Sequence, residues 1–297
     1  MNRSRAAEAA LVGNTIIWGA TFVLVKAALS DISPILFIAL RFSLATLALL
    51  AVFRRSALPS GSGPRSWKAV GAGALAGVFL FSGYIFQTMG LRLTTAPRSA
   101  FITGLTSVAV PLLAALVYRL RPQVSEVVGV LVATAGLALM TLPGVLGPVR
   151  LGDLLTICCA FGFAAHIVTL GHFTEQMSYE LLSVTQIGVA ALLGWALFSW
   201  VERPRVAWRP AVVWAILITG LLATALAFSI QAWAQRYASP ARTALIFMLE
   251  PVVAWITSYC IAGEGLSGRA AAGAALILGG VMLVELKPLN SRQHQFQ

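Results

Sequence analysis

Apolar stretches close to twenty residues in length recur along the whole of this 297-residue chain. An α-helix needs about twenty apolar residues to cross about 30 Å of hydrocarbon. Hydrophobic residues make up 59% of the sequence and charged residues only 10%, whereas a soluble domain is about one-quarter charged. The pattern therefore predicts an all-α protein that crosses a membrane many times.

Ten membrane spans are predicted, joined by connections too short to hold a soluble domain. The one loop rich in Pro, Gly and Ser, SALPSGSGPRS (56–66), follows the second span and is predicted to be a surface turn. The predicted spans cover residues 9–28, 34–53, 69–90, 95–118, 124–142, 152–172, 180–201, 211–235, 240–262 and 267–286.

One stretch of the sequence recurs in similar form in the second half of the chain. TTAPRSAFITGL (94–105) returns as ASPARTALIFML (238–249), in the same register over a separation of 144 residues. The same register continues upstream and downstream, and it pairs Arg98 with Arg242, Leu105 with Leu249, Gln87 with Gln231, Gly129 with Gly273 and Gly136 with Gly280. We therefore predict two repeats of five helices, 1–146 and 147–297.

The glycines within the spans are interpreted as faces for close helix packing and are given no chemical role. They are Gly71, Gly73 and Gly77 in the third span, the pair Gly129 and Gly136, and the pair Gly273 and Gly280.

An odd number of spans in each repeat determines how the two repeats are related. If both fold alike, the second must enter the membrane with the opposite polarity. Many secondary transporters have such inverted repeats, with a substrate site near the membrane midplane where the repeats meet. Two equivalent halves can exchange conformations, so the repeat favours transport by alternating access, although repeats with an odd number of spans also occur in channels.

Several motifs, spread over both halves, belong to one recognisable pattern: WGATFVLVKAAL (18–29), ALRFSLA (39–45), the repeated stretch, SPARTALIFMLEPVVAWI (239–256) and GEGLSGRAAAGAALILGGVML (263–283). These motifs resemble those of EamA-type proteins of the drug/metabolite transporter superfamily. The resemblance covers essentially the whole chain. It implies ten helices in two inverted halves and movement of small organic solutes, as in amino-acid exporters of the YddG type. The halves depart from each other at Glu250-Pro251, which stands where the first half has Thr106 and Ser107.

The net charge of +11 is better explained by membrane topology than by nucleic-acid binding. Lys and Arg lie mainly near the ends of the spans, where they set the orientation of the chain in the membrane. With ten spans both termini lie on the same side of the membrane, and the loops and termini of that side carry more Lys and Arg than the loops of the other side. The side richer in Lys and Arg is normally the cytoplasmic one. We therefore expect a multi-pass protein of the cell (inner) membrane with both termini in the cytoplasm and no cleavable signal. The expected partners are membrane lipid and a small-molecule substrate, with no nucleic acid, and the expected state is a monomer or weak homodimer.

Polar and aromatic residues within the spans are the candidates for substrate binding, since polar groups in a membrane need a partner or a function. Asn14 and Trp18 share one face of the first span. The predicted substrate-binding set is Asn14, Trp18, Thr21, Tyr84, Gln87, Ser99, Thr103, His166, Phe228, Gln231 and Phe247. Together they would offer aromatic walls and a few neutral hydrogen-bonding groups. The alternative is that the hydroxyl and amide groups bond their own or neighbouring helices.

Glu250 and Arg41 are the charged residues that lie well inside predicted spans. Glu250 precedes Pro251, which removes a backbone hydrogen bond and frees a carbonyl one turn earlier. Glu250 either carries a proton during transport or holds this broken turn, and the structural role is favoured. Arg41 either pairs with Glu250 or extends its long side chain toward the membrane surface, and the second is favoured.

Other function classes lack support in the sequence. There is no nucleophile elbow, HExxH motif or P-loop, so neither an enzyme nor a self-contained ATP-driven pump is expected. The three cysteines, Cys158, Cys159 and Cys260, are interpreted as apolar filler, and no metal or cofactor is expected. Aromatic walls with little fixed charge suit an apolar or aromatic amino acid, while nucleosides, vitamins and other neutral metabolites stay open as alternatives.

Overall fold

The structure is a computed structural model, and it describes residues 3–54, 64–94, 96–119, 122–145, 148–174, 177–262 and 267–285. Most of the predicted loop 56–66 and the expected boundary between the repeats at 146/147 lie outside these residues. The helices are α1 (Arg3–Ala28), α2 (Pro34–Phe53), α3 (Pro64–Leu93), α4 (Ala96–Gly104), α5 (Thr106–Tyr118), α6 (Val124–Val145), α7 (Leu151–Phe173), α8 (Tyr179–Val201), α9 (Pro210–Gly220), the π-helix η1 (Leu221–Leu226), α10 (Ala227–Ala234), α11 (Pro240–Phe247), α12 (Glu250–Ala262) and α13 (Gly268–Glu285).

These helices form the ten predicted membrane segments, because three segments are each built from consecutive pieces. α4 and α5 make the fourth, α9, η1 and α10 the eighth, and α11 and α12 the ninth. Within the described residues, eight segments are long and apolar enough to cross a membrane, and Gly268–Val284 is a shorter apolar helix. α1, whose 26 residues include Glu8 and Lys26, completes the ten.

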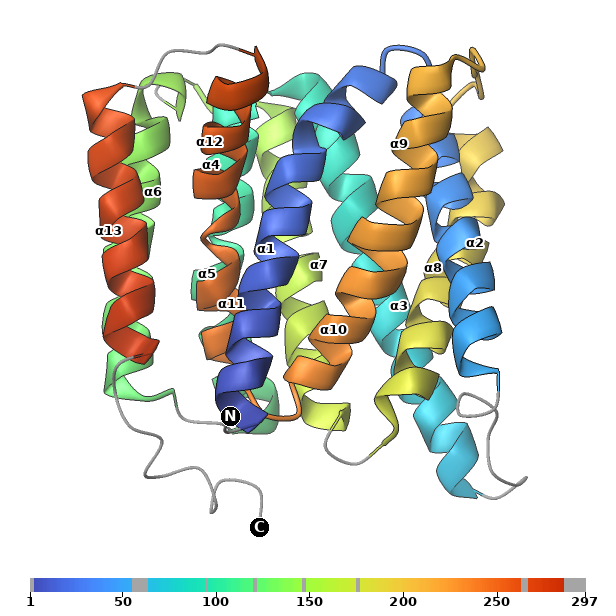
Figure 1. Cartoon of the computed structure of the whole chain (residues 1–297), viewed down its shortest axis with the longest axis horizontal. Coiled ribbons are helices and arrows are strands. Elements are labelled where there is room, and N and C mark those ends of the chain that lie inside the picture. The colour runs from blue at the N-terminus through green and yellow to red at the C-terminus, as the bar shows by residue number, and fades with distance from the viewer. Residues whose placement is uncertain are drawn as a thin grey trace.

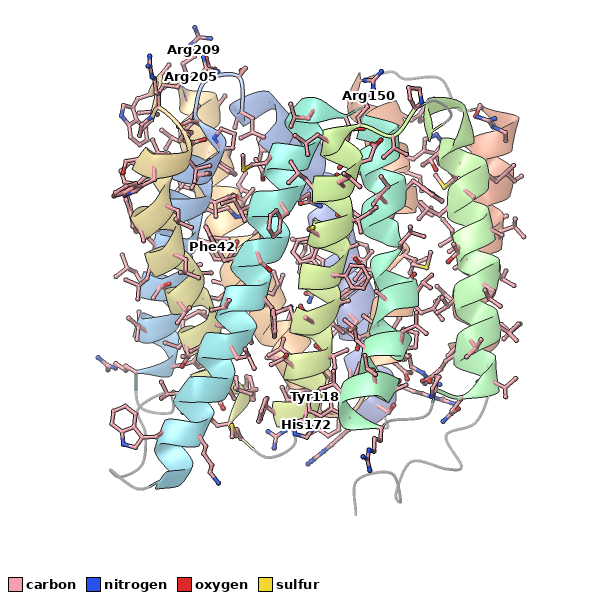
Figure 2. The ribbon with its side chains drawn as sticks, turned by 180° about the vertical axis from the view of Figure 1, so that it is seen from behind. Phe42, Tyr118, Arg150, His172, Arg205 and Arg209 are labelled. Atoms are coloured by element: carbon pink, nitrogen blue, oxygen red, sulfur yellow. The ribbon has the colours of Figure 1, made fainter. Side chains whose placement is uncertain are left out.

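The two halves run in opposite directions through the bundle. α1 begins at the lower end in Figure 1, whereas Arg150, directly before α7, lies at the opposite end together with Arg205 and Arg209 (Figure 2). α6 and α13 pack together at one edge of the bundle, and α2 and α8 pack together at the other. The equivalent helices of the two halves thus pair about a pseudo-two-fold axis in the membrane, and the fold is an inverted repeat.

Close approach of α6 to α13 explains why glycine recurs in both helices. A Cβ atom built on Gly136 would lie 2.5 Å from the carbonyl oxygen of Gly273, and one built on Gly273 would lie 2.5 Å from the carbonyl oxygen of Gly136. Gly129 and Gly280 repeat this reciprocal contact at 2.8 and 2.6 Å. The predicted packing role of these glycines is confirmed, since only glycine lets the two backbones come so close.

A second glycine contact joins α3 to α8. A Cβ atom on Gly73 would lie 2.6 Å from Thr185 Cβ, and one on Gly77 would lie 2.5 Å from the carbonyl oxygen of Gln186. Gly71 was expected on the same packing face, but a Cβ there would meet nothing within 4 Å. That expectation is wrong because α8 passes only the later part of this glycine series.

The fourth and ninth membrane segments are broken at equivalent places. The first breaks at Leu105, whose N–H bonds the carbonyl of Ile102, and the second at Leu249, whose N–H bonds the carbonyl of Ile246. In the second half Pro251 lacks the N–H that would bond Phe247. In the first half the hydroxyls of Thr106 and Ser107 bond the carbonyls of Thr103 and Gly104 at 2.6 and 2.9 Å. Different residues therefore produce the same interruption.

A buried ion pair joins three helices at the end where α1 begins. The Arg242 guanidinium in α11 donates to Glu8 in α1 and, through Nη2, to the carbonyl of Val284 near the end of α13 at 3.1 Å. Both charged residues are buried. The start of α1 and the end of α13 therefore lie on the same side of the bundle.

Candidate functional site

Aromatic rings from both halves meet inside the bundle. The Trp18 ring of α1 lies 5.3 Å from Phe228 of α10 and 4.9 Å from Phe247 of α11, measured between ring centroids. The Tyr84 ring of α3 lies 6.4 Å from Phe228 and 5.4 Å from Phe163 of α7. All four pairs are edge-to-face or tilted, the arrangement that aromatic rings prefer. We call Trp18, Tyr84, Phe163, Phe228 and Phe247 the aromatic cluster.

The polar groups of α1 hold the aromatic cluster in place. Asn14 Nδ2 donates to the carbonyl of Ala227 at 2.7 Å, and Trp18 Nε1 donates to the carbonyl of Ala223 at 2.8 Å. This confirms that Asn14 and Trp18 share a face, as their spacing predicts. Because the indole N–H is already hydrogen-bonded, only the ring of Trp18 is available for contact with a bound molecule. Asn14 Oδ1 is fully buried and has no hydrogen-bond partner among the described residues.

The π-helix η1 places Thr224 against Arg41. In a π-helix each N–H bonds five residues back, and such segments occur often at functional sites. Thr224 Oγ1 donates to the carbonyl of Thr219 at 2.8 Å and accepts from Arg41 Nε and Nη2 at 3.0 and 2.8 Å. The three hydrogen bonds use the full capacity of this hydroxyl.

Arg41 points into the protein and not toward the membrane surface. Only 5% of the residue is exposed, and its guanidinium carbon lies 5.2 Å from the centre of the Tyr84 ring and 5.6 Å from that of Phe42. Figure 2 shows Phe42 near mid-height in the bundle. The expectation that Arg41 extends to the surface is therefore wrong, because Thr224 and the rings offer a buried alternative. Arg41 is not paired with Glu250 either, since the two side chains do not come within 4 Å.

Glu250 is the first residue of the half-helix α12. Its side chain is half-buried. Across the part of the chain that the structure describes, the Glu250 carboxylate has neither an ion-pair partner nor a hydrogen-bond donor. The positive end of the α12 dipole faces it, which favours a negative charge at this position.

His166 and the glutamines form a second layer behind the aromatic cluster. His166 is buried, bonds Gln186 of α8 through Nε2 at 2.7 Å and meets Phe228 edge-on at 5.7 Å. Gln231 Nε2 donates to Gln235 at 3.1 Å, and Gln235 in turn bonds the carbonyl of Ile167 at 2.9 Å. Only Gln87 among the predicted amide groups is half-buried without a hydrogen bond to a described residue. His166 thus supports the Phe228 ring of the aromatic cluster.

The hydroxyl groups of Thr21, Ser99 and Thr103 have different surroundings. Thr21 Oγ1 bonds the carbonyls of Ile17 and Trp18 at 2.8 and 3.1 Å. Thr103 lies near the thiol of Cys159, with 3.9 Å between oxygen and sulfur, and Ser99 is buried. For Thr21 the alternative interpretation, bonding back to the helix, fits the structure better than a substrate contact.

Four residues beside these groups were absent from the prediction: Phe42, Phe163, Gln186 and Thr224. Phe42, Phe163 and Gln186 each pack against a neighbouring helix. Such packing is common for these residue types, so the sequence gives no signal that they lie beside the candidate site. Thr224 sits in the apolar run LLATAL (221–226). A threonine in an apolar span is a weak signal, and only the π-helix gives it a partner across the bundle.

This fold and this arrangement define a class. Two inverted five-helix halves, discontinuous helices in the middle of the bundle and charged groups between them are the features of a membrane transporter for small solutes. The EamA-like transporter family model matches the chain twice, at residues 5–142 and 150–286. The protein belongs to the EamA-like transporter family.

Similar proteins carry the same general description. Two proteins of Archaeoglobus fulgidus, each named an uncharacterized transporter, are 33% and 28% identical to this chain and cover 92% and 94% of it, or 83% and 96% of their own lengths. The uncharacterized transporter YyaM of Bacillus subtilis is 26% identical over 92% of the chain and 91% of its own length. A solved crystal structure superposes with a TM-score of 0.80 over 95% of this chain and 97% of that one, at 20% identity, which shows a shared fold.

Proposed function

We propose that the protein is a secondary transporter that exports amino acids with apolar or aromatic side chains by alternating access. The observation that carries the proposal is the aromatic cluster, in which Trp18 from the first half contacts Phe228 and Phe247 from the second. A substrate held there would contact both halves at once. Export is taken as the direction because amino-acid exporters are among the members of the family that the sequence motifs resemble.

The broken helices support alternating access. The interruptions at Leu105 and Leu249 occupy equivalent positions in halves of opposite orientation. Movement of one half relative to the other at these points would exchange an inward-open state for its outward-open counterpart. The buried pair of Arg242 and Glu8 would close the side on which α1 begins.

Transport by purified protein in liposomes tests this function. We expect saturable counterflow of L-phenylalanine and L-leucine, with Trp18→Ala lowering the uptake about 10-fold because the substrate loses an aromatic wall worth about 1.5 kcal/mol. Trp200→Ala is the matched control, since Trp200 is 87% exposed, and it should transport as the wild type does. Saturable flux of nucleosides without flux of amino acids would assign the alternative substrate class, and single-channel currents would assign a channel.

The orientation of the chain is a further part of the proposal. The protein is expected in the cell (inner) membrane with both termini in the cytoplasm. Reporter fusions at residues 60 and 297 should therefore report the cytoplasm, and a fusion at residue 205 should report the opposite side. Reporters at 60 and 297 on different sides would contradict the orientation, and reporters at all three positions on the reverse sides would invert it.

A further inference from the structure

The loop between α8 and α9, residues 202–209, carries three exposed arginines. They are Arg203, Arg205 and Arg209. Figure 2 shows Arg205 and Arg209 at one corner of the bundle, at the end opposite to the start of α1. Arg209 forms an ion pair with Asp31 at 3.3 Å, whereas neither Arg203 nor Arg205 has an ion-pair partner among the described residues. The loop therefore presents two uncompensated guanidinium groups at the surface.

Hydrogen bonds to the turn between α1 and α2 hold this loop in place. An isolated antiparallel β-bridge joins the two segments. The N–H of Ser33 bonds the carbonyl of Arg205 at 2.9 Å, and the N–H of Ala207 bonds the carbonyl of Asp31 at 2.8 Å. The N–H of Arg205 also donates to the hydroxyl of Ser33 at 3.1 Å. A loop held in this way loses little conformational entropy when it binds a ligand, since its backbone is already ordered.

The acidic residue of the loop is engaged elsewhere. Glu202 Oε1 accepts the N–H groups of Ile35 and Leu36 at 2.8 and 3.0 Å, at the start of α2. Its charge therefore serves the positive end of the α2 dipole. The proposed orientation places the loop outside the cytoplasm, where Lys and Arg are normally less frequent. Membrane topology thus does not account for three arginines here, and their charge calls for an external anion.

The surroundings of the loop indicate which anion is at hand. Trp200 in the last turn of α8 is 87% exposed, and Trp208 directly before α9 is 63% exposed. Tryptophans at the ends of membrane segments lie at the level of the lipid headgroups. Farther along the same two helices, Leu192 and Trp214 are exposed and apolar, as expected of a surface that faces acyl chains. The arginines therefore lie at the depth of the phosphate groups, beside a surface suited to lipid tails.

We propose that the loop 202–209 binds the phosphate of an anionic phospholipid through Arg203 and Arg205, with the acyl chains along the outward faces of α8 and α9. A guanidinium can bind two phosphate oxygens through parallel N–H groups. Phosphatidylglycerol keeps the negative charge of its phosphate, whereas the choline group of phosphatidylcholine brings a cation beside the arginines. The site therefore selects lipids by headgroup charge, and it goes beyond the proposed transport of a small solute.

Native mass spectrometry of the purified full-length protein measures this binding with phosphatidylglycerol and phosphatidylcholine of identical acyl chains. We expect the wild type to bind phosphatidylglycerol about 10- to 30-fold more tightly, since each arginine near an anionic headgroup adds to the affinity. The double variant Arg203→Gln with Arg205→Gln should lose most of this preference. Both side chains are exposed and the backbone bonds of Arg205 remain, so the variant should fold as the wild type does. Arg203→Lys with Arg205→Lys keeps the charge without the fork and should keep part of the preference.

Arg150→Gln is the matched control. Arg150 is exposed at the same end of the bundle but away from this corner (Figure 2), so its replacement should leave the preference unchanged. Equal binding of the two lipids by the wild type, or the same loss in Arg150→Gln as in the double glutamine variant, would overturn the site. Competition by glycerol 3-phosphate at the concentration of the lipid would assign the arginines to soluble phosphates and overturn the lipid assignment. The measurement involves no transport, so its outcome is distinct from a failure of the proposed function.

Discussion

Replacing Glu8 by glutamine is expected to lower the free energy of unfolding by about 3–5 kcal/mol, because it leaves the buried Arg242 charge without its anion. Arg242 is 3% exposed and Glu8 is 7% exposed, so water cannot replace the lost partner. Beyond Glu8, the Arg242 guanidinium bonds the carbonyl of Val284, while its Nε atom has no hydrogen-bond partner among the described residues. The measurement is unfolding of the purified protein in mixed micelles with increasing SDS.

Asp31→Asn is the matched control for this prediction. Asp31 and Arg209 form an ion pair at 3.3 Å whose side chains are 18% and 69% exposed, and breaking an exposed pair costs about 0–1 kcal/mol. The double variant Glu8→Gln with Arg242→Gln should recover much of the loss, since no charge is then left buried. A Glu8→Gln protein as stable as the Asp31→Asn protein would show that the buried pair contributes little to folding.

Gly280→Leu is expected to lower the free energy of unfolding by at least about 3 kcal/mol, the upper part of the range for overpacking. A Cβ atom at Gly280 would lie 2.6 Å from the carbonyl oxygen of Gly129 and 3.0 Å from the backbone nitrogen of Ala133. Both are backbone atoms, so no change of rotamer relieves the overlap and α13 must move away from α6.

The neighbouring residue provides the control. A Cβ atom at Gly279 would meet nothing within 4 Å, and the residue is exposed on the outer face of α13. Gly279→Leu should therefore leave the stability unchanged or raise it by up to about 1 kcal/mol through helix propensity. SDS unfolding of both variants checks the difference. Equal effects at 279 and 280 would contradict the close helix contact.

The sequence alone determined the membrane segments, their number and their inverted relation. Hydropathy identifies these segments directly, because a segment surrounded by lipid must be apolar over its whole length. The prolines at 34, 210 and 240 lie at helix starts, because proline fits the first turn of a helix. The repeat then required opposite polarity of two five-span halves. The shared face of Asn14 and Trp18 and the glycine contacts of α6 with α13 followed from helical spacing, since both depend on neighbours within one helix.

The tertiary structure decided what the polar groups bind. Nothing near Arg41 in the sequence indicates Thr224, because the two are 183 residues apart and meet only through the π-helix η1. The ion pair of Glu8 and Arg242 and the contact of His166 with Gln186 join helices in the same way. Sequence periodicity gives the direction of a side chain around its own helix, but not which helix lies opposite. Packing of the two halves therefore determined which charges are satisfied: it paired Arg242 with Glu8 and placed Arg41 against Thr224.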